Sequence, residues 1–286
     1  MPPPAVRRRR LLAAVATVAT VIAVAAPVLA VTVPASAQSS VHYVALGDSY
    51  SSGVGAGSYY SSSGSCDRSA NAYPALWDAA SKPASYTSVA CSGATTSTVI
   101  SSQLSALSSA TTLVSITIGG NDVGFATVME TCVLLPTGSC VTAVDAAEEE
   151  ISTQLPAELN SVLADIAADA PDARVVVLDY PEPYDLSQSA SCIGLSTTDR
   201  TDLNQAADDL DSQIQAAAHR YHDVFADVRT AFAGHEICDS DSWLNSVDWL
   251  DLDESYHPTA AGQSGAYYPV FSGAVASPAF LTSTLR

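Results

Sequence analysis

The sequence predicts an α/β fold, a three-layer α/β/α sandwich around a mostly parallel five-stranded sheet. Short runs of aliphatic and β-branched residues alternate along the chain with segments whose apolar residues recur at helical spacing. This alternation indicates parallel strands joined by crossover helices. No linker-like stretch and no internal repeat interrupts residues 38–286. We therefore expect a single domain there, long enough to bury one sizeable core.

The five predicted strands are short apolar or β-branched runs bounded by turn residues. They cover residues 41–46, 86–90, 112–118, 174–179 and 224–228. Helices are predicted over residues 72–80, 98–107, 143–168 and 198–221, with a final helix from about Pro258, because proline is favoured in a first turn. Pro156 is expected to start, kink or split the third of these helices. Two loops are expected, one over residues 51–65 beside the presumed site and one between Cys132 and Cys140.

The first 37 residues are predicted to be a secretory signal peptide. Arginines occupy positions 7–10, residues 11–33 are almost wholly apolar, and Ala35, Ser36 and Ala37 form a small-residue cleavage signature. Pro27 and that signature argue against retention of the apolar run as a membrane anchor. We expect a secreted, extracellular protein whose mature chain begins at Gln38.

The mature chain is strongly acidic. Removing residues 1–37 leaves seven basic against 30 acidic side chains, a net charge of −23. This charge argues against nucleic acid or an anionic membrane as a tight partner. It suits a soluble exported protein, which we expect to be a monomer.

Six cysteines remain after the leader, and an even number in an exported chain indicates disulfides. They are Cys66, Cys91, Cys132, Cys140, Cys192 and Cys238. Six cysteines allow 15 pairings, and the sequence alone leaves these open. No two have the close C-x-x-C spacing of structural zinc sites, so no metal is expected.

Three predicted strands end in small or polar residues suited to one site. Ser49 follows the first strand, Gly93 the second and Asn121 the third. Because the carboxyl ends of parallel strands meet at one edge, we expect these residues to lie together. Ser49 can act as a nucleophile, while the Gly93 N–H and the Asn121 amide can bind an oxyanion. Taken singly, each also has a structural interpretation as a cap or turn residue.

A histidine is the expected base, because its pKa suits proton transfer near neutral pH. His257 is favoured among the five, since it lies in a predicted loop, precedes Pro258 and follows Glu254 by three residues. The other histidines fall on a strand, at a helix end or in an unplaced loop. We expect activity to rise with pH through a midpoint of about 6–7, the ordinary range for histidine.

Four blocks of the sequence resemble those of the SGNH hydrolases. Gly47-Asp48-Ser49-Tyr50 is similar to the GDSL nucleophile block, although Tyr50 replaces leucine. Gly93 matches the second block, Gly119-Gly120-Asn121-Asp122 the third, and Ser255-Tyr256-His257-Pro258 the last. The secreted form with six cysteines resembles the actinobacterial extracellular lipases, esterases and phospholipases. This resemblance implies the SGNH (flavodoxin-like) fold and sequential disulfides: Cys66–Cys91, Cys132–Cys140 and Cys192–Cys238.

The resemblance implies acyl transfer through a Ser49 ester without a cofactor. His257 would act as general base, and the Ser49 and Gly93 N–H groups with the Asn121 amide would form the oxyanion hole. Two groups are candidates for orienting His257: the Glu254 carboxylate and the Ser255 backbone carbonyl. The G-x-S-x-G elbow of α/β-hydrolases is absent from this block.

The leading hypothesis is a secreted serine carboxylic-ester hydrolase, a lipase or esterase acting on lipid or other small-molecule acyl esters. The alternative within the enzymes is a carbohydrate O-deacetylase, and outside them a secreted binding module that has lost catalysis. The aromatic residues available to line an acyl groove or a sugar platform are Tyr59, Tyr60, Trp243 and Trp249, although core positions are expected for both tryptophans.

Overall fold

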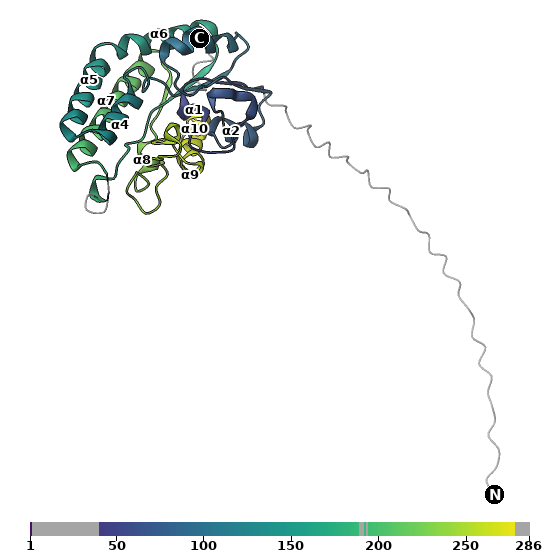
Figure 1. Cartoon of the computed structure of the whole chain (residues 1–286). Helices are drawn as coiled ribbons and strands as arrows, with labels where there is room; N and C mark the ends of the chain where they lie inside the picture. The colour runs from purple at the N-terminus through teal and green to yellow at the C-terminus, as the bar shows by residue number, and fades with distance from the viewer. Residues whose placement is uncertain (2–39, 189–191, 193, 278–286) are drawn as a thin grey trace. The chain divides into compact units, whose positions relative to one another are not determined.

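A five-stranded, wholly parallel sheet organises the computed structural model, which describes Met1, residues 40–188, Cys192 and residues 194–277 (Figure 1). The strands are β1 (His42–Ala45), β2 (Ser85–Ser88), β3 (Leu113–Ile116), β4 (Arg174–Leu178) and β5 (Val224–Ala226), in the order β2-β1-β3-β4-β5. The predicted fold class and strand number are confirmed. Apart from Met1, the predicted signal peptide lies outside the described residues.

The strand order explains why the first strand ends at a site. β1 pairs with β2 on one side and with β3 on the other, so successive connections leave it in opposite directions. In open parallel sheets such a reversal opens a crevice beyond the carboxyl ends of the strands. Central β3 and β4 are buried at every position, whereas edge strand β2 is partly exposed. The crevice therefore begins where β1 ends, shortly before Ser49.

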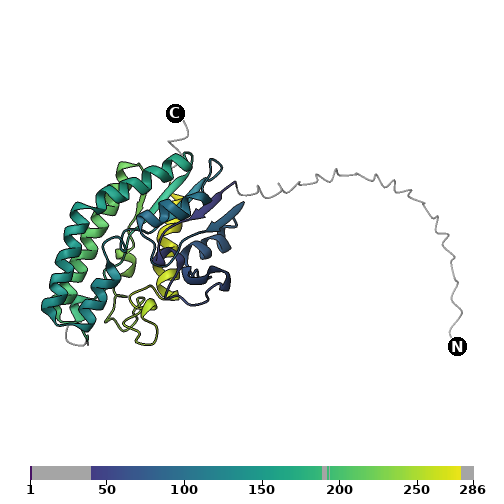
Figure 2. The ribbon, with the colours of Figure 1, turned by 45° about the horizontal axis from the view of Figure 1, so that its top comes forward.

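Helices cover both faces of this sheet. Within the described residues, the α-helices of four residues or more are α1 (Ser49–Ser52), α2 (Tyr73–Ser81), α4 (Phe125–Leu134), α5 (Thr137–Thr153), α6 (Leu155–Asp169), α7 (Thr197–Arg220), α8 (Arg229–Phe232) and α10 (Tyr268–Ala276). Figures 1 and 2 show α4, α5, α6 and α7 gathered together, away from α2 and α10. Tyr43 of β1 stacks on Phe271 of α10 and packs edge-on against Trp77 of α2. Within the described residues no helix is both long and apolar enough to cross a membrane.

Two predicted elements differ from the structure. Cys132 and Cys140 do not bound a loop excursion, because they lie in α4 and α5 and only residues 135–136 separate these helices. Pro136 caps α5 with an extended backbone, which is sufficient to end one helix and start the next. The predicted helix over 98–107 is broken into α3 (Thr96–Thr98), the π-helical turn η2 (Val99–Gln103) and the 3₁₀ turn η3 (Leu104–Ala106). Pro156 does split the long helix, since it lies in the first turn of α6.

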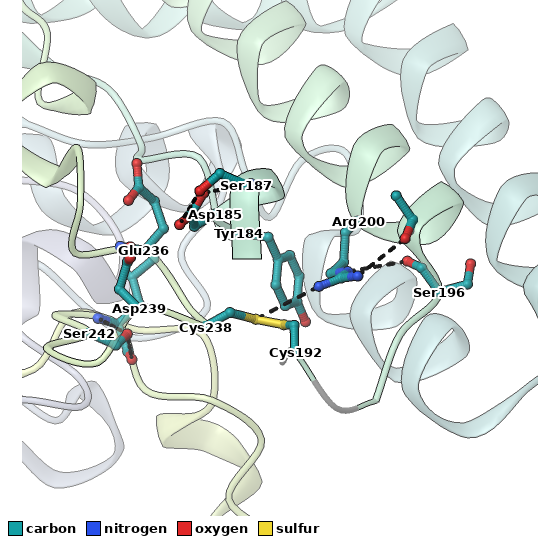
Figure 3. Close-up of a disulfide and its surroundings, with 12 residues drawn as sticks. Tyr184, Asp185, Ser187, Cys192, Ser196, Arg200, Glu236, Cys238, Asp239 and Ser242 are labelled. Carbon is teal, nitrogen blue, oxygen red and sulfur yellow. Dashed lines mark hydrogen bonds between the residues drawn. A yellow bond between two sulfur atoms is a disulfide. The ribbon is translucent and has the colours of Figure 1, made fainter. Parts of the chain in front are cut away.

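Three disulfides join the six cysteines in sequence order, as the resemblance implies. They are Cys66–Cys91, Cys132–Cys140 and Cys192–Cys238. Figure 3 shows the third bridge beside the Arg200 side chain, which is buried and donates a long hydrogen bond of 3.9 Å to Cys238 Sγ. This bridge ties the chain just before α7 to the segment that leads to His257.

Candidate active site

Ser49 occupies the first turn of α1, directly beyond β1. Gly47 makes this turn possible: its φ is +118°, and a Cβ there would meet the Thr117 carbonyl oxygen at 2.4 Å. Gln103 holds the same residue from both sides, because its Oε1 accepts from Gly47 N–H at 2.8 Å and its Nε2 donates to the Gly47 carbonyl at 2.9 Å. The position of Ser49 is therefore set by a turn that requires glycine and by a buried amide.

The buried carboxylate of Asp48 supports the turn that carries Ser49. Its carboxylate accepts hydrogen bonds from the Tyr50 N–H at 3.0 Å and the Thr117 hydroxyl at 2.8 Å. Tyr180, just past the end of β4, donates its phenolic O–H to the other carboxylate oxygen. Burial raises the pKa of Asp48 to about 6, and these three donors act against that rise. This network joins the ends of β1, β3 and β4 beneath the site.

Ser49 and His257 are in direct contact, although 208 positions separate them. Ser49 Oγ lies 2.7 Å from His257 Nε2, within hydrogen-bond distance. Ser49 is buried, whereas the imidazole is half-buried in a cavity wall. A nucleophile and a base that meet at this distance have the geometry required for proton transfer from the hydroxyl.

Three N–H donors belong to residues that line the same cavity as His257. The Ser49 and Gly93 N–H groups make no hydrogen bond within the described residues, and both residues line the cavity. Gly93 has φ +75°, a backbone conformation that favours glycine. Asn121 donates one amide hydrogen to the Ala94 carbonyl at 3.0 Å, which leaves its second amide hydrogen for a ligand.

Asp122 locks the second and third blocks together. Its carboxylate accepts from the Thr96 N–H at 3.0 Å and from the Thr96 hydroxyl at 2.6 Å. Because Thr96 begins the short helix after Gly93, this contact fixes the Gly93 turn relative to Asn121. Ser49, Gly93, Asn121 and His257 all line this one cavity.

The backbone around His257 is held by distant residues. Asn245 donates its backbone N–H to the His257 carbonyl at 2.9 Å and accepts from the Tyr256 N–H at 2.9 Å. Tyr256 itself has φ +64°, and its carbonyl accepts a hydrogen bond from the Tyr50 phenol at 2.7 Å. The Tyr50 ring also packs on the imidazole, with centroids 5.2 Å apart. Tyr50, the residue after Ser49, therefore anchors the segment that carries His257.

Burial lowers the pKa of His257 to about 4, while the nearby backbone carbonyls, chiefly that of Ser255, act in the opposite direction. Its Nδ1 is buried, and no hydrogen bond of normal geometry reaches this atom within the described residues. The ordinary histidine pKa expected from the sequence is therefore shifted downward, because that expectation took no account of burial.

Glu254 does not contact the imidazole in the structure. Its Oε1 accepts a hydrogen bond from the Tyr59 phenol at 2.5 Å, and the Tyr59 oxygen accepts in turn from the Gly55 N–H at 2.8 Å. Burial and the neighbouring carboxylate raise the pKa of Tyr59. The Glu254 carboxylate, one of the two groups considered from sequence as an orienter, thus ties the residue 53–60 loop to the segment that carries His257.

Comparison with known proteins places this site in a family. Residues 45–264 match the GDSL-like Lipase/Acylhydrolase family. The chain belongs to this family. It is 56% identical over 234 residues to Lipase 1 of Streptomyces coelicolor, a match that covers 81% of this chain and 86% of the relative.

Two solved structures are also similar to this GDSL-family chain. They are phospholipase A1 of Streptomyces albidoflavus (54% identity) and an extracellular lipase of Streptomyces rimosus (51% identity). Each superposes with a TM-score of 0.79 and covers 81% of this chain and 98% of its own. With the family match, these similarities identify the protein as an ester hydrolase.

The GDSL-family site opens into a cavity of about 470 Å³. Apolar side chains from α4, α5 and α7 form most of its walls, among them Val128, Met129, Ile151, Leu203 and Leu210. The polar groups gather at one end, where Ser49 and His257 meet. Within the described residues no group of three or more His, Cys, Asp or Glu side chains is arranged to hold a metal ion.

Other residues named from the sequence lie elsewhere. Trp243 is half-buried and stacks on His235 with centroids 3.6 Å apart, while Trp249 is 65% exposed. The expected core position is therefore wrong for Trp249, because its segment passes over the cavity mouth instead of under a helix layer. Tyr59 and Tyr60 are exposed, and neither lines the cavity.

Sequence reasoning did not assign three supporting residues: Gln103, Tyr180 and Asn245. A signal existed for Gln103, a polar residue on the apolar face of a predicted helix, and for Tyr180, which follows the end of a predicted strand. No local pattern marks Asn245, whose partners Gly55 and His257 are 190 and 12 positions away.

Proposed function

We propose that this ester hydrolase cleaves esters of fatty acids through a Ser49 acyl-enzyme, with His257 as general base. The observation that carries the proposal is the meeting of Ser49 Oγ and His257 Nε2, 2.7 Å apart, at the polar end of an apolar cavity. The cavity accommodates an acyl chain, while its polar end holds the ester carbonyl. Lipase and phospholipase relatives at 51–56% identity agree with this substrate class.

The reaction follows from the placement of these groups. His257 takes the proton of Ser49 as Oγ attacks the ester carbonyl, and the oxyanion accepts from the Ser49 and Gly93 N–H groups and the Asn121 amide. His257 then gives the proton to the leaving alcohol. A water molecule attacks the acyl-serine with His257 again as base, which releases the fatty acid and restores Ser49.

The backbone carbonyl of Ser255 is the proposed orienter of His257 in this mechanism. Carbonyl groups stabilise the Nδ1–H tautomer and so leave Nε2 free to face Ser49. In support, the Ser255 carbonyl acts to raise the imidazole pKa, and the Glu254 carboxylate is engaged by Tyr59.

We propose export to the extracellular medium, with residues 1–37 as the removed leader and residues 38–286 as a single monomeric domain. Three disulfides suit an oxidising compartment. Amino-terminal sequencing of protein from the culture medium should begin at Gln38, and size-exclusion chromatography should give the mass of one mature chain. An uncleaved leader would contradict the proposed removal of residues 1–37, and a dimer would contradict the proposed monomer.

The substrate proposal is tested with a chain-length series of p-nitrophenyl esters, run beside acetylated xylan. Each CH₂ buried in the cavity stabilises binding by about 0.8 kcal/mol, so kcat/KM should rise about fourfold per CH₂ until the cavity is full. An organophosphonate probe should label Ser49 and leave Ser49→Ala unlabelled. A preference for acetylated xylan, with no gain along the ester series, would favour the carbohydrate deacetylase instead.

A further inference from the structure

Five large apolar side chains stand in solvent at the cavity mouth. They are Leu134 (56% exposed), Leu135 (52%), Trp249 (65%), Leu250 (98%) and Leu252 (60%). We call this set the mouth surface. Side chains of this size bury readily, and a group of them left exposed on one part of a folded protein marks an interaction surface.

The mouth surface comes from two segments that border the same cavity. Leu134 ends α4, and Trp249 and Leu252 belong to the segment that precedes His257; all three line the cavity. Leu135 and Leu250 adjoin them without lining it. The exposed apolar surface is therefore continuous with the apolar cavity, so an acyl chain passing between them stays in apolar surroundings.

A tight turn places Trp249 and Leu250 at the tip of their segment. The Asp251 N–H donates to the Asp248 carbonyl at 3.3 Å, and the Leu250 N–H donates to the Asp248 carboxylate at 2.8 Å. These bonds close the turn on itself and direct its two central side chains outward. The turn thus presents apolar groups to solvent by its own backbone structure.

The charges around the mouth surface indicate which kind of partner fits. Asp248, Asp251 and Asp253 are exposed between its apolar residues. Neither residues 122–173 nor residues 230–277, the segments that build the surface, contain a lysine or arginine. An anionic lipid surface would be repelled at short range, whereas zwitterionic headgroups carry no net charge to oppose the approach.

We propose that the mouth surface docks the enzyme on a zwitterionic phospholipid surface and opens the cavity directly onto the lipid. This inference rests on the proposed hydrolysis of fatty-acid esters. Trp249 and the leucines enter the boundary between headgroups and acyl chains, where amphipathic tryptophan rings are favoured, and the aspartates remain among the headgroups. Ser49 then meets an ester drawn from the lipid without crossing water.

The test measures binding separately from catalysis. Full-length mature protein carrying Ser49→Ala is sedimented with phosphatidylcholine vesicles, alone and with Leu135→Asp and Leu250→Asp added. Neither added position lines the cavity. Partition should fall at least tenfold in the variant with both aspartates. Leu186→Asp, at a leucine that is 38% exposed outside the cavity lining, is the matched control and should bind as the parent does.

A second measurement uses the active enzyme with Ser49 intact. Leu135→Asp with Leu250→Asp should leave hydrolysis of a monomeric short-chain ester unchanged and should slow hydrolysis of phosphatidylcholine vesicles at least tenfold. Tryptophan emission of the Ser49→Ala protein should shift to shorter wavelength on vesicles, and Trp249→Phe should remove that shift. Unchanged melting temperatures confirm that the exposed substitutions leave the fold intact.

The outcomes separate the two proposals. Equal partition of the parent and the doubly substituted protein, no binding to phosphatidylcholine, or tighter binding to phosphatidylglycerol vesicles would each overturn the docking surface. Vesicle binding that depends on Leu135 and Leu250, without any hydrolysis of long-chain esters by the wild type, would retain the surface and overturn the proposed function.

Discussion

The segments that carry Ser49 and His257 are held in place by different means. Residues 47–52 are buried and lie in a network of side-chain hydrogen bonds beneath the sheet edge, centred on Asp48 and Gln103. Residues 245–258 run along the cavity mouth, and they are held chiefly by hydrogen bonds to their backbone N–H and carbonyl groups. Ser49 thus lies in the core, and His257 lies at the edge of the core.

This difference shows that the segment carrying His257 meets two structural requirements at once. The base segment has to place an imidazole within 2.7 Å of Ser49 and also present Trp249 and Leu250 to solvent. Hydrogen bonds from Asn245 and Tyr50 to the backbone of this segment place the imidazole and leave Trp249 and Leu250 exposed. Substitutions in the two segments should therefore differ in how much activity they remove.

The largest effect is expected where the two segments meet. Ser49→Ala and His257→Ala should each lower kcat by at least about 10⁴-fold, because either change removes the nucleophile–base pair. The double variant should be little worse than either single one, since the two residues act as a unit. Turnover of a short-chain ester measures this. Additive losses, or near-normal turnover of either single variant, would contradict the pairing.

The pH dependence of kcat/KM should show how burial affects the pKa of His257. His257 accepts a proton only when neutral, so activity rises with pH as the imidazole deprotonates. Burial lowers its pKa to about 4, so the acid limb should lie at least about one unit below the ordinary histidine value of 6.5. The enzyme would then retain at least half of its activity at about pH 5.5, whereas a midpoint of about 6.5 or above would contradict the effect of burial.

Tyr50→Phe should weaken the contact between the two segments while leaving the fold of each intact. The change removes the hydrogen bond to the Tyr256 carbonyl, about 1 kcal/mol, and loosens the base. We expect kcat to fall about fivefold with KM unchanged, because the cavity that binds the acyl chain keeps its shape. Tyr86→Phe on edge strand β2 is the matched control and should have no effect. A rise in KM alone would assign Tyr50 to substrate binding instead.

The smallest effect is expected at Glu254. The amide oxygen that Glu254→Gln introduces can still accept from the Tyr59 phenol, so turnover should fall less than about tenfold. Tyr59→Phe removes this contact altogether and should also lower turnover less than about tenfold. A loss above about a thousandfold would mean that the carboxylate is a true triad acid, which would defeat the backbone-carbonyl interpretation.

Much of the fold was predictable from local pattern. The strands over 112–118 and 174–179 are continuous apolar runs because both faces of β3 and β4 are covered, and such runs are readable in sequence. The connection between Cys132 and Cys140 was not, because cysteine, proline and glycine together are typical of loops. Helix packing over both flanks of Pro136 leaves only a two-residue break there.

The site residues divide in the same way. Ser49, Gly93 and Asn121 follow strands whose ends must share one edge, so the sequence by itself determined that they converge. Only the tertiary structure decided that Glu254 accepts from Tyr59 and that Trp249 is exposed. It also decided how Tyr50, Tyr59 and Asn245 hold the segment that carries His257. These contacts join residues 190 or more positions apart or depend on a positive φ at Tyr256. Strand periodicity is a local property, whereas burial and long-range hydrogen bonds exist only once the chain has closed around its core.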